Sequence, residues 1–229
     1  MGIIAALGGG SFDNGEMIPV AEHIISLSKK SNPSVVFLPT AGFDDINGDE
    51  PIRDAFLSLG CSFDILFLTD KSLSYDDIEK KILGCDIIYA GGGNLQFLMD
   101  TLKATGADKA LRKAYDNGVV MSGLSSGAMC WFTEGYDDCG ENASFVFVDC
   151  LGFLPHCYCP HFISEHWQSF SNAIKSRPHS GIGVEDGAAL VHDGEKYYVI
   201  SGNEDGDAFF FDKNDGYKKI NITNNADIL

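Results

Sequence analysis

Through its first two thirds, this 229-residue chain alternates short apolar runs with longer amphipathic segments, a pattern that few folds can accommodate. The amphipathic segments repeat apolar residues at helical spacing, as Ile24 and Leu27 do, while each apolar run has the length of one buried strand. Near-continuous apolar strands separated by helices are typical of a parallel sheet that helices cover on both faces. We therefore predict an α/β fold with a mainly parallel central sheet. The expected strands span 3–10, 34–42, 62–68, 85–94 and 119–128, and the expected helices span 16–30, 51–60, 74–84 and 106–118.

After residue 180 the pattern changes to short strands joined by Asp-Gly turns. The segments 188–202 and 207–222 each have the alternation and the turn residues of a β-hairpin. We expect both hairpins at the edge of the same domain. The chain contains no linker, repeat or low-complexity stretch, so we predict a single domain over residues 1–229.

Charge and cysteine content restrict the partners and the compartment. The formal net charge is -17 at pH 7, and such a field repels nucleic acid and anionic membranes, so we expect neither as a partner. The cysteines number seven and show no paired framework, which favours a reducing compartment. No apolar run is long enough to span a bilayer and no basic leader is present, so we expect a cytoplasmic protein, as a monomer or homodimer.

Glycine clusters stand where three of the expected strands end. They read GGGS at 8–11, GGGN at 91–94 and GLSSG at 123–127. Glycine allows a tight bend and a close approach of backbone to ligand. Because ligands of parallel α/β sheets bind at the carboxyl ends of the strands, we expect the functional site at these three turns.

The third cluster carries two adjacent serines, of which one fits a nucleophile elbow. That motif needs small residues two positions before and after the serine, and Ser125 has Gly123 and Gly127 there, whereas Ser126 lacks glycine at both positions. A helix beginning at Ser126 would direct backbone N–H groups toward a developing oxyanion. The alternative interpretation is a tight strand-to-helix turn without chemistry. We predict that Ser125 is a nucleophile.

A nucleophilic serine needs a base, and His161 is the candidate among six histidines. It follows Pro160 in an extended segment, and its competitors nearby are His156 and His166, the latter in an expected helix over 164–174. The remaining three, His23, His179 and His192, lie near a helix face or in turns, where no functional role is expected.

A metal site is the other interpretation of this histidine segment. Cys157, Cys159 and His161 would share one face of a strand, with Glu165 and His166 following. Zinc prefers such ligands, but this spacing spreads the donors along the strand and no C-x-x-C pair accompanies them. We therefore expect neither a metal nor a cofactor.

Four motifs together resemble the peptidase E and cyanophycinase family of serine peptidases. They are GGGN at 91–94, GLSSGA at 123–128, PHF at 160–162 and GIGVEDGAAL at 181–190, in the same order along the chain as in the family. The resemblance implies a three-layer α/β/α fold similar to that of class I glutamine amidotransferases, whose elbow nucleophile is a cysteine. It also implies hydrolysis of a short peptide, dipeptide or isopeptide bond.

The resemblance assigns catalytic roles to particular residues. Ser125 corresponds to the family's nucleophile and His161 to the histidine of its proline-histidine-phenylalanine motif. Asp186 stands where the family usually has glutamate, and Glu185 is adjacent, so either could orient the histidine. An acid between serine and histidine in the sequence is a third option, namely Asp138 or Glu141.

The same comparison assigns the oxyanion site. The GGGN turn would supply one backbone donor, from Gly92 or Gly93, and Asn94 would shape the cleft. Ser126 occupies a position where the family has alanine, so its N–H would be the other donor while its side chain would be a spectator.

The basic residues bear on the substrate. Aspartyl dipeptidases of this family need an arginine or lysine to hold a carboxylate, yet the chain has neither between Lys113 and Lys175. A pocket cation could still come from Arg53, Lys175 or Arg177, whereas a cyanophycin-type substrate with β-linked arginines would fit an acidic cleft. A non-catalytic small-molecule binding domain of the same fold is the alternative function.

Overall fold

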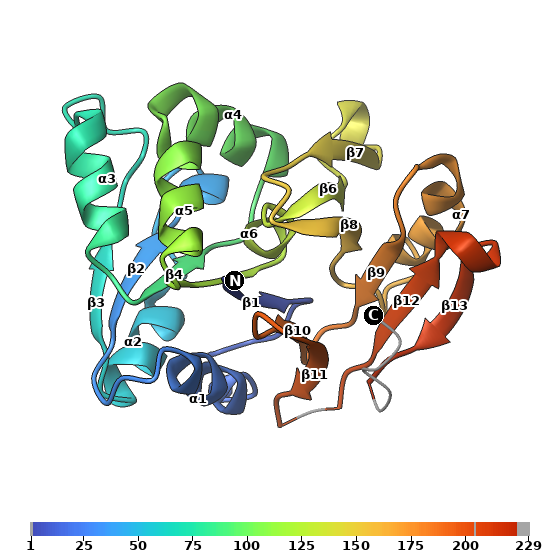
Figure 1. Cartoon of the computed structure of the whole chain (residues 1–229), viewed down its shortest axis with the longest axis horizontal. Coiled ribbons are helices and arrows are strands. Elements are labelled where there is room, and N and C mark those ends of the chain that lie inside the picture. Colours follow the sequence, from blue (N-terminus) through green and yellow to red (C-terminus); the bar gives the residue numbers. More distant parts are fainter. Residues whose placement is uncertain (1, 204, 224–229) are drawn as a thin grey trace.

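The computed structural model describes residues 2–203 and 205–223, which form two sheets and the helices around them (Figure 1). In the first sheet the strand order is β11-β10-β1-β5-β4-β2-β3. Neighbours among β1, β5, β4, β2 and β3 are parallel, and β10 and β11 extend the sheet as an antiparallel hairpin. The strand bounds are β1 Ile3–Leu7, β2 Ser34–Leu38, β3 Ser62–Ile65, β4 Ile87–Ala90, β5 Val120–Leu124, β10 Ala188–His192 and β11 Tyr197–Ser201. This is the mainly parallel sheet that the sequence predicts.

Helices cover both faces of the first sheet, which gives three layers (Figure 1). Helices α1 (Ile18–Leu27) and α2 (Glu50–Ser58) share one apolar cluster with side chains from β1, β2, β4 and β5. Helices α3 (Tyr75–Leu83), α4 (Leu95–Thr105) and α5 (Ala107–Asp116) pack on the opposite side of the same strands. Successive strand residues alternate between the two clusters because side chains along a strand point to opposite faces. In the described part of the chain, none of the helices has the length and apolarity that crossing a membrane requires.

A second sheet of six strands lies beside the first, in the order β13-β12-β9-β8-β6-β7 (Figure 1). Within it, β8 pairs parallel to β6 and β9, and the other pairs are antiparallel. The strand bounds are β6 Phe132–Asp137, β7 Val146–Asp149, β8 Leu154–Cys159, β9 Gly181–Val184, β12 Ala208–Asp212 and β13 Lys218–Asn221. The chain passes from this sheet back to the first between β9 and β10, so that the turn between these strands lies where the two sheets adjoin (Figure 1).

The structure differs in several features from the sequence-based prediction. Helix α4 and the strands β6, β7 and β9 were not expected, and the second predicted hairpin, β12–β13, belongs to the second sheet. The predicted helix over 164–174 is broken into short pieces, of which α7 (Phe170–Ala173) is the longest. The other helical segments are α6 (Ser126–Met129) and the 3-10 turns Thr40–Gly42, Glu141–Ala143, Trp167–Ser169, Ile174–Ser176 and Lys213–Asp215.

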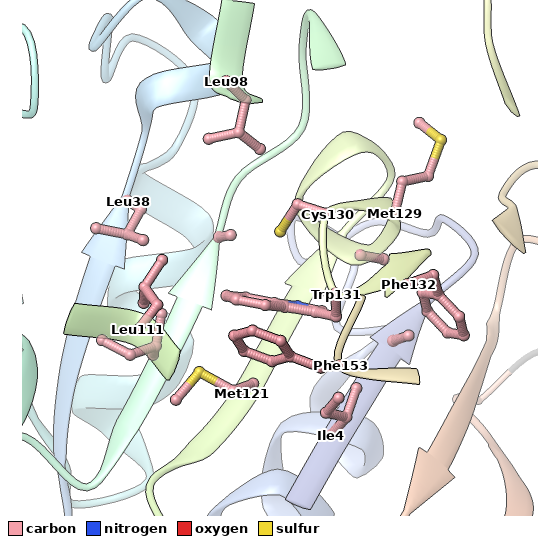
Figure 2. Close-up of a cluster of buried hydrophobic side chains, with 14 of the residues drawn as sticks. Ile4, Leu38, Leu98, Leu111, Met121, Met129, Cys130, Trp131, Phe132 and Phe153 are labelled. Atoms are coloured by element: carbon pink, nitrogen blue, oxygen red, sulfur yellow. The ribbon is translucent and has the colours of Figure 1, made fainter. Parts of the chain in front are cut away.

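A buried cluster anchors the short helix α6 beneath the glycine turns. Figure 2 shows Met129, Cys130, Trp131 and Phe132 directed into the apolar interior, together with Phe153. The rings of Trp131 and Phe153 lie 5.7 Å apart between their centroids. The chain just after the two serines is therefore held by a large apolar contact rather than by the length of its helix.

Candidate active site

The three glycine clusters meet at the carboxyl edge of the first sheet. In the parallel register, Leu7 of β1 lies opposite Leu124 of β5, and Ala90 of β4 lies opposite Gly123. The turns that follow β1, β4 and β5 are therefore neighbours in space. This is the arrangement that places ligand sites at strand ends in parallel α/β sheets.

Ser125 occupies a strained turn between β5 and α6. Its φ is 55° and its ψ is -119°. L-residues rarely adopt this backbone conformation, which occurs mainly where the surrounding structure enforces it. The flanking glycines permit this turn, because a Cβ on Gly123 would lie 2.3 Å from the carbonyl oxygen of Gly127, and a Cβ on Gly127 would lie 2.1 Å from that of Ala90. A nucleophile elbow requires a strained residue of this kind, between a strand and a helix and with close packing at the positions two residues before and after it.

His161 comes from the second sheet, directly after β8. Its backbone is also left-handed, with φ of 50°, and its N–H donates to the carbonyl of Gly8 over 3.0 Å. This bond ties the histidine to the turn that follows β1. The His161 Nε2 lies 3.0 Å from the Ser125 Oγ, and the Trp167 ring packs beside the imidazole at 5.3 Å between centroids.

Asp186 lies in the turn between β9 and β10, where the chain crosses from one sheet to the other. Its Oδ1 is 2.6 Å from the Nδ1 of His161. A carboxylate only accepts hydrogen bonds, so Nδ1 carries the proton and Nε2 is left to accept the proton of Ser125. Gly9 makes room for this pair, since a Cβ there would lie 1.6 Å from the Asp186 Oδ1.

The other acids predicted as alternatives lie elsewhere. Glu185 Oε2 accepts the N–H of Asp207 at 3.0 Å, so this carboxylate faces the strand β12 side of the turn. Asp138 is exposed just after β6, and Glu141 is exposed in the 3-10 turn Glu141–Ala143. The structure therefore brings Asp186, but none of these three, into hydrogen-bond contact with His161 in the part it describes.

The residues of the metal interpretation are dispersed. Cys157 and Cys159 are buried in an apolar cluster of the second sheet, and burial raises the pKa of both thiols. Glu165 and His166 are exposed. Within residues 2–203 and 205–223, no three His, Cys, Asp or Glu side chains are arranged so that they could hold a metal ion.

The oxyanion candidates surround the Ser125 side chain. A Cβ on Gly92 would lie 3.3 Å from the Cβ of Ser125, so the GGGN turn packs directly against the serine. The amides of Gly92, Gly93 and Ser126 have no hydrogen-bond acceptor among the described residues. Asn94 instead begins helix α4, where its Oδ1 accepts the N–H of Phe97 at 2.8 Å.

The hydroxyl of Ser126, which the resemblance implies to be a spectator, makes buried contacts with two neighbouring segments. It is buried, donates to the carbonyl of Gly93 over 2.6 Å and lies 3.3 Å from the Oδ2 of Asp137. Burial, together with the adjacent Asp138 carboxyl, raises the pKa of Asp137 to about 6. No sequence motif singles out Asp137, because its contact with Ser126 depends on how β6 folds back over α6.

The three candidate pocket cations bond to other groups. Arg177 pairs with the buried Glu134 of β6, and Lys175 donates to the Asn172 side chain over 3.1 Å. Arg53 lies 2.9 Å from the carboxylate of its neighbour Asp54 on the exposed side of α2. None of the three is recorded in contact with Ser125, His161 or Asp186 in the described structure.

The family model and the curated relatives that match this chain are all described as peptidases. The sequence model of peptidase family S51 matches residues 4–200. The uncharacterized peptidase YgaJ of Bacillus subtilis (strain 168) is 37% identical over 194 residues, which are 82% of this chain and 81% of that protein. Lmo0363 of Listeria monocytogenes serovar 1/2a, also named an uncharacterized peptidase, is 27% identical over 154 residues, 64% of this chain and 74% of that one.

Solved structures of peptidases share the fold. The crystal structure of a peptidase from an acI-B1 actinobacterium superposes with a TM-score of 0.75 at 19% identity, covering 97% of this chain and 94% of that one. A putative peptidase E protein from Listeria monocytogenes EGD-e gives a TM-score of 0.68 at 20% identity, covering 88% and 98%. At such identities the likeness concerns the fold alone.

Proposed function

Since this chain belongs to peptidase family S51, we propose that it is a serine-type peptidase that hydrolyses a short peptide, dipeptide or isopeptide bond through Ser125, His161 and Asp186. The family and the named relatives support a peptidase activity as such. The observation that carries the finer proposal is the continuous pair of contacts, 3.0 Å from Ser125 Oγ to His161 Nε2 and 2.6 Å from His161 Nδ1 to Asp186 Oδ1.

In the proposed reaction the Ser125 Oγ attacks the carbonyl carbon of the scissile bond while His161 Nε2 takes the hydroxyl proton. Asp186 holds the imidazole in the required tautomer and stabilises the imidazolium that forms. His161 then gives its proton to the leaving amine as the C–N bond breaks, and an acyl ester on Ser125 remains. Water attacks this ester with His161 again as the base, which releases the acid and restores the serine.

The negative charge that develops on the carbonyl oxygen needs backbone donors. The free amide of Ser126 lies directly after the nucleophile, and the free amides of Gly92 and Gly93 lie on the facing turn. Donors aimed in advance at this oxygen stabilise the transition state more than the ground state. The proposal therefore assigns the oxyanion site to Ser126 together with Gly92 or Gly93.

We extend the proposal to short substrates but not to aspartyl specificity. A pocket for an aspartyl side chain needs a cation, and Arg53, Lys175 and Arg177 bond to Asp54, Asn172 and Glu134 instead. A screen of a dipeptide library, with isoaspartyl and β-linked arginine dipeptides included, would identify the accepted residues.

Labelling with a fluorophosphonate tests the mechanism without knowledge of the substrate. The wild-type protein should react and Ser125→Ala should not, because no other serine in the described structure has a histidine base within hydrogen-bond distance. Asp186→Ala should lower the labelling rate about a thousandfold, whereas the adjacent Glu185→Ala is the matched control and should change it little.

Two outcomes would contradict the proposal. If wild-type protein is not labelled, the alternative of a non-catalytic binding domain gains support. If Glu185→Ala lowers the rate as much as Asp186→Ala does, the assignment of the acid is wrong, although Ser125 and His161 would keep their roles.

A further inference from the structure

Ser126, Asp137 and the turn over 92–94 are joined by buried hydrogen bonds that the reaction described above leaves unexplained. The side chains of Ser126 and Asp137 are each only 1% exposed. The Ser126 Oγ donates to the carbonyl oxygen of Gly93 over 2.6 Å, and the Asp137 Oδ2 lies 3.3 Å from the same Oγ. The Asp137 Oδ2 also accepts the N–H of Leu95 at 3.1 Å, so this carboxylate is bonded directly to the residue after Asn94 and is linked through the Ser126 hydroxyl to the residue before it.

These bonds hold one end of the turn that faces Ser125. At the same end, the Asn94 amide donates to the segment just after β2 over 2.8 Å, and at the other end the Gly91 amide donates to a carbonyl of β2 over 2.9 Å. The peptide between Gly93 and Asn94 is therefore fixed through its carbonyl as well as its N–H. Between the fixed ends lie only the two free amides, those of Gly92 and Gly93.

We propose that Ser126 is a positioning residue that aligns the two halves of the oxyanion site. The Ser126 amide is one half of that site. The Ser126 hydroxyl holds the Gly92–Gly93 turn, which carries the amide of the other half. The inference rests on the proposed function and adds a role that the nucleophile, base and acid do not supply. A family alanine at this position could offer the amide but not the hydroxyl bond.

The single proton of the Ser126 hydroxyl determines how this side chain interacts with Asp137. A serine hydroxyl has one proton, and the shorter contact shows that it is directed to the Gly93 carbonyl. The contact with Asp137 is then favourable when the carboxyl is protonated and donates to the Ser126 Oγ. An asparagine at position 137 with its oxygen in the place of Oδ2 would accept the N–H of Leu95 at every pH and leave the bond from Ser126 to Gly93 intact, because it carries no charge.

The titratable groups that face Asp137 leave it without a cationic partner among the described residues. On its own strand end these are the Asp138 carboxyl, which favours the protonated form, and the Cys139 thiol. From the packed strands they are the thiols of Cys150 and Cys159. Burial raises the pKa of all three thiols, so they are neutral and do not hold Asp137 ionised.

The test separates the binding of a fluorophosphonate from its reaction with Ser125. In that reaction the Oγ attacks phosphorus, fluoride leaves and His161 takes the proton, while the phosphonyl oxygen occupies the oxyanion site. Ser126→Ala should lower the first-order rate constant about tenfold and leave the half-saturating probe concentration unchanged, a smaller loss than that for removing a donor outright. Asp137→Asn should react within about threefold of wild type, and Asp137→Leu should lose rate as Ser126→Ala does.

Ser122→Ala is the matched control, since Ser122 lies on β5 just before the two serines, is fully buried and has a hydroxyl without a hydrogen-bond partner among the described residues. It should react like wild type. A rate constant for Ser126→Ala within about twofold of wild type, or an equal loss in Ser122→Ala, would overturn the proposal.

Amide hydrogen exchange of the peptide covering 91–98, read by mass spectrometry, is a second measurement that does not require catalysis. Exchange should be faster in Ser126→Ala than in Ser122→Ala, because the turn has lost one of its fixed points. If wild-type protein reacts with no fluorophosphonate, the proposed function fails, and this exchange still decides whether Ser126 holds the turn. Unchanged exchange in Ser126→Ala would overturn the positioning role.

Discussion

Replacement of Arg177 by glutamine should destabilise the second sheet by leaving a buried carboxylate without its cation. Glu134 on β6 is 3% exposed, and its Oε2 receives the Arg177 Nε at 3.0 Å and the Cys157 Sγ at 3.1 Å. Burial alone would raise the pKa of Glu134, but the bonds from Arg177 and Cys157 outweigh it and hold the pKa below the usual 4.5. Cys157 belongs to β8, the strand that leads to His161, so the pair holds the strand before the proposed base as well as the sheet.

The magnitude follows from the burial of the two partners. Breaking a buried ion pair by removing one side destabilises a protein by about 3–5 kcal/mol. The Arg177 side chain is 35% exposed, so water screens the pair in part, and we expect the lower end of that range, about 3 kcal/mol in the free energy of unfolding. Since domains are stable by about 5–15 kcal/mol, this is a large fraction of the total.

The effect should also depend on pH with a definite sign. A carboxyl whose pKa is lowered by folding stabilises the native state above its unfolded pKa and loses that contribution as the pH falls. The difference between wild type and Arg177→Gln should therefore be largest near neutral pH and shrink below about pH 4.5, where Glu134 takes up a proton.

Denaturant unfolding followed by tryptophan fluorescence measures this difference. Lys175→Gln is the matched control, because that exposed lysine bonds only to Asn172, and it should change the free energy of unfolding by less than about 0.5 kcal/mol. Adding Glu134→Gln to Arg177→Gln should recover part of the loss. If Arg177→Gln proves as stable as Lys175→Gln, the buried pair does not support the sheet as argued.

Two further predictions concern the site. Asp137→Asn should stabilise the protein at pH 7–8 and hardly at pH 4. The reason is that folding raises the pKa of Asp137 from 3.8 to about 6, which disfavours its ionised form by up to about 3 kcal/mol. Unfolding curves that shift equally at both pH values would contradict this. Gly9→Ala should lower fluorophosphonate labelling about a hundredfold, because its methyl group would displace Asp186 from His161, and unchanged labelling would refute the close approach.

Local patterns sufficed to predict the central sheet and to single out Ser125 as the candidate nucleophile. Buried strands such as β1 and β4 are short apolar runs, and their alternation with amphipathic helices has few solutions other than a covered parallel sheet. Ser125 could be distinguished from Ser126 because the glycines it needs are two residues away on either side, within the range of a sequence motif.

The second sheet could not be anticipated in the same way. The order of its strands does not follow the chain, since β8 pairs with β6 rather than with β7, and β6 and β7 are short segments without a distinct periodic signal. Helix α4 was also missed. Its N-cap, Asn94, is the last residue of the GGGN motif, which had been interpreted only as a turn at the end of a strand. Which strands pair is decided by contacts between distant segments, and no local pattern contains them.

For the site, the sequence by itself determined the elbow serine, the histidine after an extended segment and a choice between two adjacent acids. The tertiary structure alone decided that Asp186 meets His161 while Glu185 turns to Asp207, because neighbouring side chains in a turn point in different directions and their partners come from other elements. It likewise placed Asp137 beside Ser126. The contact between Ser126 and Asp137 forms because β6 folds over α6. The hydrogen bonds of these side chains therefore exist only in the folded protein, where the two sheets are packed together.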